Sequence, residues 1–195
     1  MAKRKTLSPW KPSRADQLKS ISRRVPDVIA LDLKILFCGI NPGLYSAAVG
    51  HHFAGPGNLF WPTIHTTGFT PRLFTAFDEP DMLALGYGIT NLVPRASAAA
   101  DDVSKEELRA GARTVRRKVR KYKPRYLAVL GLAAYRLAFE KSKAQVGLQD
   151  PLGVSAVYLL PNPSGLNAFH QPAILNEMFA AFRALALGEP VVAIT

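Results

Sequence analysis

The sequence predicts an α/β protein with a mostly parallel central sheet of about four strands and helices on both of its faces. Short apolar segments alternate along the chain with segments of helical spacing, which is typical of parallel strands joined by helices. The run ILFC at 35–38 is apolar at every position and too short for an isolated amphipathic helix. Such a run indicates a strand that is buried on both faces.

Four strands and five helices are expected from this alternation. The strands are expected at 34–40, 87–93, 125–131 and 154–160. The helices are expected at 57–66, 79–85, 104–122, 132–140 and 171–187. The third helix has the clearest start, because Ser104 and Glu107 have the spacing of a capping box.

The N-terminal residues 1–25 are expected to form a basic, partly flexible arm, in part helical near 14–24, ahead of one domain at 26–195. The chain has 25 Lys and Arg against 14 Asp and Glu, a formal net charge of +11. An excess of this size favours nucleic acid as the partner. The arm could add contacts to phosphates that are independent of base sequence. The predicted helix at 104–122 is unusually basic and could contribute to the field that attracts DNA.

Cysteine and histidine usage limits the possible chemistry. Cys38 is the only cysteine, so a disulfide within the chain and Cys-rich metal sites are both excluded. The four histidines include no HExxH pair, so no metal site is expected. The chain also lacks the GxGxxG, GxxxxGK[ST] and GxSxG patterns in a suitable context, so we expect no nucleotide cofactor and no serine-hydrolase triad.

No apolar run approaches the roughly 20 residues of a membrane helix. The N-terminus is basic but has no apolar region of the kind found in signal peptides. We therefore expect a soluble cytoplasmic protein with no membrane partner.

Asparagine residues lie at or near the ends of three predicted strands. Asn41 and Pro42 follow the first strand, Asn162 and Pro163 follow the fourth, and Asn91 lies within the second. The carboxyl ends of parallel strands share one edge of a sheet, where ligands bind in open α/β folds. The two Asn-Pro turns could therefore face one cleft.

Three motifs carry a family resemblance. They are GINPGL at 39–44, FAGPGNLFW at 53–61 and LPNPSGLN at 160–167. In this order and spacing they resemble the mismatch-specific uracil-DNA glycosylases, a family that also contains the thymine-DNA glycosylases. The resemblance extends from about Ile35 to Leu187 and leaves the basic arm outside.

The resemblance implies a three-layer α/β/α sandwich and a monofunctional DNA N-glycosylase without a cofactor, a hydrolase of base excision repair. The enzyme would remove flipped-out uracil, preferentially from G·U mispairs in double-stranded DNA, and leave an abasic site. It would act as a monomer in the cytoplasm, at the nucleoid of a bacterium. One alternative is a broad glycosylase for uracil and damaged pyrimidines, and another is a DNA-binding module without catalysis.

The resemblance also implies roles for individual residues. Asn41 would hold the attacking water, and an amide at this position predicts slow chemistry, because it cannot take the proton of the water at neutral pH. Phe53 would stack on the flipped base. The rest of the base pocket would consist of Ile40, Gly43, Ser46 and Asn91. Ile40 would contribute backbone, Gly43 would leave room beside the base, and Ser46 would lie near C5 of the pyrimidine.

The third motif implies contacts with the duplex. Leu166 would enter the space that the flipped base vacates, and its neighbours Gly165 and Asn167 would contact the widowed partner base. Asn162 and Ser164 would lie near the target nucleotide and its phosphates.

A carboxylate that assists the water is conceivable at Asp101 or Asp102.

Overall fold

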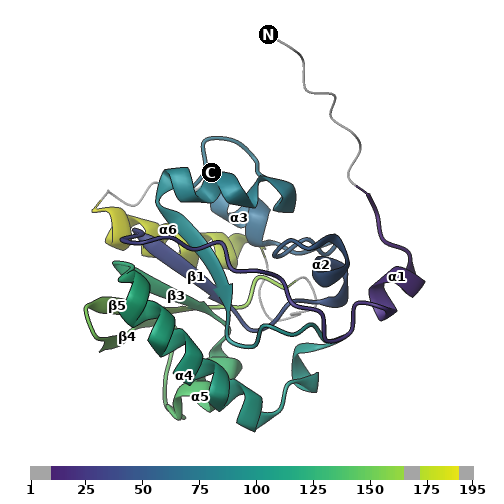
Figure 1. Cartoon of the computed structure of the whole chain (residues 1–195). Coiled ribbons are helices and arrows are strands. Elements are labelled where there is room, and N and C mark those ends of the chain that lie inside the picture. Colours follow the sequence, from purple (N-terminus) through teal and green to yellow (C-terminus); the bar gives the residue numbers. More distant parts are fainter. Residues whose placement is uncertain (1–9, 165–171, 189–195) are drawn as a thin grey trace.

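A five-stranded sheet forms the middle layer of the computed structural model, which describes residues 10–164 and 172–188 (Figure 1). The strands are β1 (Ile35–Gly39), β2 (Tyr87–Asn91), β3 (Tyr126–Leu130), β4 (Gly147–Leu152) and β5 (Ser155–Leu160). Their order is β2-β1-β3-β5-β4, and every neighbouring pair is parallel except the antiparallel pair of β4 and β5.

Helices cover both faces of this sheet, so the predicted fold class is confirmed (Figure 1). On one face lie α4 (Lys105–Tyr122) and α5 (Leu132–Phe139), and on the other lie α3 (Phe60–Thr66), the 3₁₀ helix η1 (Ala76–Leu85) and α6 (Pro172–Leu187). The shorter elements are α1 (Arg14–Leu18), α2 (Leu44–Val49) and the 3₁₀ turn η2 (Ala100–Asp102).

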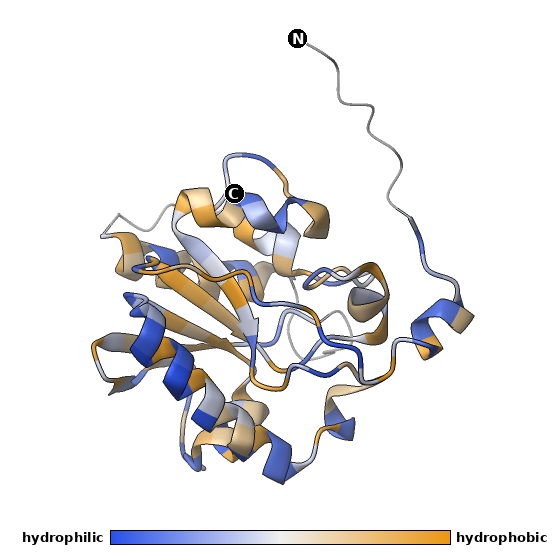
Figure 2. Ribbon diagram, in the orientation of Figure 1, coloured by the Kyte–Doolittle hydropathy of each residue, from blue (hydrophilic) through white to orange (hydrophobic). Residues whose placement is uncertain are grey.

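Strand β1 shows why the sheet is apolar on both faces. Leu36 and Cys38 pack in the cluster beneath α4 and α5, whereas Ile35 and Phe37 pack in the cluster beneath α3 and α6. All four side chains are fully buried, and the strands are correspondingly hydrophobic in Figure 2. Burial raises the pKa of the Cys38 thiol to about 12, so this cysteine is an unreactive core residue.

The structure adds strand β4 to the four strands that the sequence predicts. β4 is the edge strand of the sheet and contains Pro151. Proline has no N–H to donate to a neighbouring strand, so it is tolerated at such an edge. Its side chains are half-buried or exposed, and its pairing with β5 is irregular between Gln149 and Leu152. A short polar edge strand of this kind has neither an apolar run nor a regular alternation, and the sequence pattern therefore missed it.

Two expected helices differ in their limits or type, and a third helix was not expected. The segment expected at 57–66 becomes helical only at Phe60, whose N–H donates to the Asn58 side-chain oxygen at 2.9 Å. The segment expected at 79–85 is the 3₁₀ helix η1, which begins earlier at Ala76 and contains Pro80. The unexpected helix α2 directly follows the Asn-Pro-Gly turn and ends at Gly50, whose φ of +79° suits glycine.

The described part of the N-terminal arm packs against the domain. Val25 is buried, and residues Ser22 and Arg23 exchange backbone hydrogen bonds with Ala96 at 3.1 and 2.8 Å. These contacts place the arm beside the loop that follows β2. None of the helices in the described ranges is both long and apolar enough to cross a membrane.

Candidate active site

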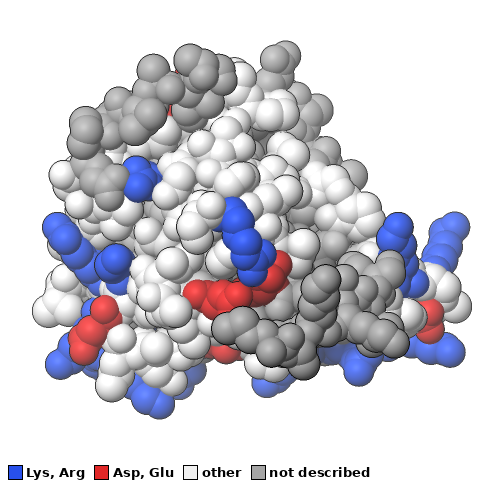
Figure 3. Space-filling view, turned by 90° about the horizontal axis from the view of Figure 1, so that it is seen from above, with Lys and Arg blue, Asp and Glu red and all other residues white. Residues whose placement is uncertain are grey.

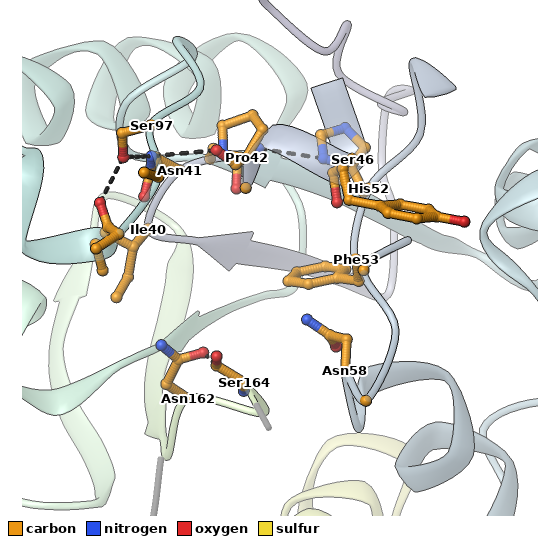
Figure 4. A pocket seen from close by; sticks show the side chains of 18 of the residues that line it. Ile40, Asn41, Pro42, Ser46, His52, Phe53, Asn58, Ser97, Asn162 and Ser164 are labelled. Atoms are coloured by element: carbon orange, nitrogen blue, oxygen red, sulfur yellow. Dashed lines mark hydrogen bonds between the residues drawn. The ribbon is translucent and has the colours of Figure 1, made fainter. Parts of the chain in front are cut away.

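A cavity of about 330 Å³ opens at the carboxyl ends of the parallel strands (Figure 4). Asn41 follows β1, Asn91 is the last residue of β2, and Asn162 follows β5, and all three line this cavity. The strand order places these ends along one edge, as the sequence led us to expect. The loop from His52 to Asn58 closes the opposite side.

The side-chain amide of Asn41 is held in one orientation by three acceptors. Its Nδ2 donates to the hydroxyl oxygen of Ser97 at 2.7 Å. It also lies 3.2 Å from the carbonyl of Pro42 and 3.4 Å from that of Arg95. Carbonyl oxygens only accept, so a turned amide would place its own oxygen against them. The Asn41 Oδ1 therefore faces away from Ser97, as Figure 4 shows.

Ser97 is a site residue that the sequence analysis missed. Its hydroxyl donates to the carbonyl of Ala99 at 2.5 Å, which leaves the oxygen lone pairs to accept from Asn41. The loop is further held by Arg95, which makes two bonds of 2.5 and 2.7 Å to the carboxylate of Glu107. The bond from Arg95 lowers the pKa of Glu107 to about 2. The sequence signal that could have identified Ser97 is its position six residues after Asn91, in the loop that follows β2 at the carboxyl ends of the strands.

A second network orients the amide of Asn91. His52 Nε2 lies 2.9 Å from the carbonyl of Pro26, which can only accept, so this nitrogen carries the proton. His52 Nδ1 then accepts from the Asn91 Nδ2 at 3.1 Å. Burial lowers the pKa of His52, which favours this neutral form. The buried carboxylate of Glu79 accepts the backbone N–H of His52 at 2.8 Å and fixes the turn.

Gly39 makes room for this arrangement. A Cβ atom at this position would lie 2.5 Å from the Asn91 Oδ1 and 3.2 Å from the ring of Phe53. Because Asn91 is also tethered to His52, its oxygen cannot move aside freely. A residue without a side chain at the end of β1 is therefore needed to hold both groups in the cavity wall.

Phe53 lines the cavity with its backbone in the left-handed region, at φ +53°. This conformation is uncommon for a bulky residue, and such residues gather at functional sites. The ring stacks on Phe60 with centroids 4.1 Å apart. The hydroxyl of Ser46 accepts the N–H of Ala54 at 3.0 Å and so supports the turn. Ser46 lines the cavity, with its oxygen engaged in holding the Phe53 loop.

The remaining predicted residues on the β1 side also line the cavity. The carbonyl of Ile40 accepts the N–H of Val93 at 2.9 Å, and its side chain lies against Gly131. Gly43 directly precedes α2 as its N-cap, with a φ of −71°, which any residue can adopt. A Cβ at Gly43 would meet no atom within 4 Å. The glycine therefore keeps space open and is not required by the backbone.

A backbone hydrogen bond joins the motif at 160–167 to the motif at 53–61. The N–H of Leu59 donates to the carbonyl of Pro163 at 2.8 Å. The side-chain oxygen of Asn162 accepts the N–H of Ser164 at 3.1 Å, which forms a tight local turn beside the cavity. The expected duplex contacts of Gly165, Leu166 and Asn167 lie outside the described residues.

The described lining of the cavity carries no charged side chain. None of the described residues that line it is acidic or a lysine. Asp101 and Asp102 do not line it, and the carboxylate of Asp102 accepts the N–H of Ala99 at 2.8 Å. Within the part of the chain that the structure describes, no cluster of His, Cys, Asp and Glu could hold a metal ion. The chemistry available here is that of amides, hydroxyls, a neutral imidazole and an aromatic face.

In the comparison with protein-family models, residues 26–185 match the uracil DNA glycosylase superfamily. This range contains the whole sheet and every described residue that lines the cavity. It covers most of the chain and leaves out the basic N-terminal arm. The chain therefore belongs to the uracil DNA glycosylase superfamily.

Proposed function

We propose that this chain hydrolyses the N-glycosidic bond of uracil flipped out of duplex DNA, preferentially at G·U mispairs, and leaves an abasic site. Members of the superfamily are DNA glycosylases, which are hydrolases of base excision repair. A base inside a duplex cannot be attacked, so it must first be extruded, which costs a few kcal/mol and least for a mispair. The cavity at the sheet edge would receive this base.

The orientation of the Asn41 amide carries the proposal. Its nitrogen is occupied by acceptors on the far side, so the carbonyl oxygen is left to hold a water for attack on the sugar. A neutral amide orients water but does not take its proton. With no carboxylate among the described lining residues, the rate must depend on stabilising the departing uracil anion and the cationic sugar. We therefore expect slow chemistry.

Asn91 and Phe53 suit a uracil base. The edge of uracil offers a carbonyl acceptor beside an N–H donor, and the Asn91 amide offers the complementary donor and acceptor. The hydrogen bond to His52 fixes which of the two positions of the Asn91 amide is the nitrogen and which is the oxygen. The ring of Phe53 offers a face on which the base stacks, an interaction worth roughly 1–3 kcal/mol. Ser46 and Gly43 then shape the space around the rest of the ring.

A monofunctional mechanism is favoured because none of the described lining residues is a lysine that could form a Schiff base with the sugar. Water is then the nucleophile. The preference for G·U mispairs is supported by the cost of extrusion and by the motif containing Leu166, which resembles the loop that enters the duplex.

The decisive experiment is single-turnover cleavage of labelled duplexes that contain G·U, A·U or G·T, and of single-stranded uracil DNA, with alkali to reveal abasic sites. We expect release from G·U first. The Asn41→Ala variant should lose roughly tenfold or more in rate while binding the G·U duplex nearly as well as the wild type. Equal turnover by this variant would remove Asn41 from the mechanism.

The other outcomes separate the alternatives. Release from every uracil context would replace mispair preference with a broad uracil and damaged-pyrimidine activity. Binding without release from any substrate would indicate a DNA-binding module without catalysis.

A further inference from the structure

A second hollow, of about 280 Å³, lies between the C-terminal half of α4 and the turn that joins β4 to β5. It is lined by Arg116, Val119, Arg120, Lys123, Leu152, Gly153 and Val154. Figure 1 shows the C-terminal end of α4 beside these two strands. Neither the superfamily match nor the proposed chemistry assigns a role to this hollow.

The hollow lies on the side of the sheet where the parallel strands begin, whereas the candidate active site lies where they end. After α4, the backbone of Tyr122 bonds to Asp32 and that of Arg125 to Leu33, both just ahead of β1. The turn at Gly153 likewise precedes β5, which is parallel to β3. The cavity, by contrast, lies at the strand ends. The hollow shares no lining residue with the cavity and is thus a separate surface.

The floor of the hollow is apolar. Val119, Leu152 and Val154 supply it, and Val154 is 79% exposed to solvent. Figure 2 shows that the outer face of α4 is otherwise strongly hydrophilic. An exposed apolar floor within a charged rim has the arrangement of an interaction site, an apolar surface bordered by polar residues.

The rim is basic and has no acidic counterpart. Elsewhere on α4, Arg109 pairs with Glu140 at 3.1 Å and Lys118 with Asp27 at 2.6 Å. Among the described residues, the rim cations Arg116, Arg120 and Lys123 make no ion pair, although the guanidinium of Arg116 lies 5.4 Å from the centre of the Phe139 ring. On the face shown in Figure 3, by contrast, a Lys or Arg side chain lies directly against the central acidic side chains. The basic rim on α4 is therefore a local concentration of unpaired charge.

We propose that this hollow docks an acidic segment of a partner protein that carries one apolar side chain between carboxylates. The carboxylates would pair with the three rim cations, and the apolar side chain would cover Val154 and Leu152. A DNA backbone would neutralise the rim, but its repeated phosphates offer no apolar side chain to fill the hollow over Leu152 and Val154. The combination of floor and rim therefore favours a peptide over DNA.

The test uses the full chain and a short fluorescein-labelled peptide of alternating Asp and Glu with one central Leu, followed by fluorescence anisotropy. Arg120→Glu and Val154→Asp should each weaken binding by about tenfold or more, and so should replacing the Leu of the peptide by Ser. The matched control is Arg117→Glu, which makes the same charge change on α4 outside the hollow. It should weaken binding by less than about threefold.

Two readouts keep the test decisive. Uracil release, measured at saturating enzyme so that any loss of DNA attraction does not count, and thermal unfolding should remain at the wild-type level in all three variants. This shows that the variants fold and that this surface is separate from the active site. Equal weakening by Arg117→Glu, or indifference to the Leu of the peptide, would overturn the proposal, because binding would then be general electrostatic attraction. Failure of the peptide to bind, with loss of binding to an undamaged duplex in Arg120→Glu, would assign the surface to DNA.

Discussion

Replacing Ser97 by Ala tests whether the orientation of the Asn41 amide matters for base release. The substitution removes the closest of the three acceptors of Asn41 Nδ2, at 2.7 Å, and leaves the longer contacts to Pro42 and Arg95. It also removes the donor to the Ala99 carbonyl. The amide should then turn more freely, and its oxygen should spend less time directed at the water.

The magnitude follows from the number of contacts that remain. A hydrogen bond between neutral groups contributes about 1 kcal/mol, which corresponds to roughly a fivefold change in rate. Because two carbonyl contacts still oppose the turned amide, the loss should be smaller than that of Asn41→Ala. We therefore expect Ser97→Ala to lower single-turnover uracil release by about fivefold with little change in duplex binding.

The assay is a double-mutant cycle measured by single-turnover release from a G·U duplex. Ser97→Thr, which keeps the hydroxyl, should restore most of the rate. Once Asn41 is Ala, the change at Ser97 should cost nothing further, because the two side chains act through one contact. A full fivefold loss in the Asn41→Ala background would refute the reasoning and give Ser97 a role of its own. Thermal unfolding of each variant serves as the control for folding.

Three further predictions concern the cavity wall and the duplex. Gly39→Ala should lower the free energy of unfolding by roughly 1–3 kcal/mol, because its Cβ would lie 2.5 Å from the Asn91 Oδ1. Gly43→Ala, with no atom within 4 Å, should unfold like the wild type and reduce only uracil release; urea denaturation distinguishes the two. Burial lowers the pKa of His52 below the usual 6.5, so as the pH falls the imidazole takes up a proton in the unfolded chain before it does so in the folded protein. Its contribution to stability should be complete above that pH and decline as the pH falls below it, and a His52→Gln variant, compared by thermal unfolding, should lose this dependence. Leu166→Ala should slow uracil release from duplex DNA much more than from single-stranded DNA; equal slowing would exclude a wedge.

The elements whose signals are local were predicted correctly. The four parallel strands have apolar runs that do not depend on their neighbours, and α4 begins at the predicted capping box, where Glu107 donates its N–H to the Ser104 hydroxyl at 3.1 Å. The strand β4 and the helix α2 were missed for the complementary reason. Each is short and is stabilised by what it packs beside, so its own residues carry little signal.

The site shows the same division. The sequence placed Asn41 and Asn162 at strand ends and Asn91 within a strand, which the structure ends at Asn91. The parallel order brings these strand ends to one side of the sheet whatever the side chains do. The partners of these residues could not be derived in this way. Asn41 is hydrogen-bonded to Ser97, which is 56 residues away in the sequence, and Asn91 to His52, which is 39 residues away.

By itself, the sequence determined the layered α/β architecture, the family resemblance and the sheet edge at which the chemistry would lie. Only the tertiary structure decided which way each amide faces, why β1 must end in Gly39, and that Ser97 belongs to the site. The physical reason is that periodicity and capping act over a few residues, whereas an amide is oriented by acceptors from loops that are distant in the chain. Those loops become neighbours only when the sheet has formed.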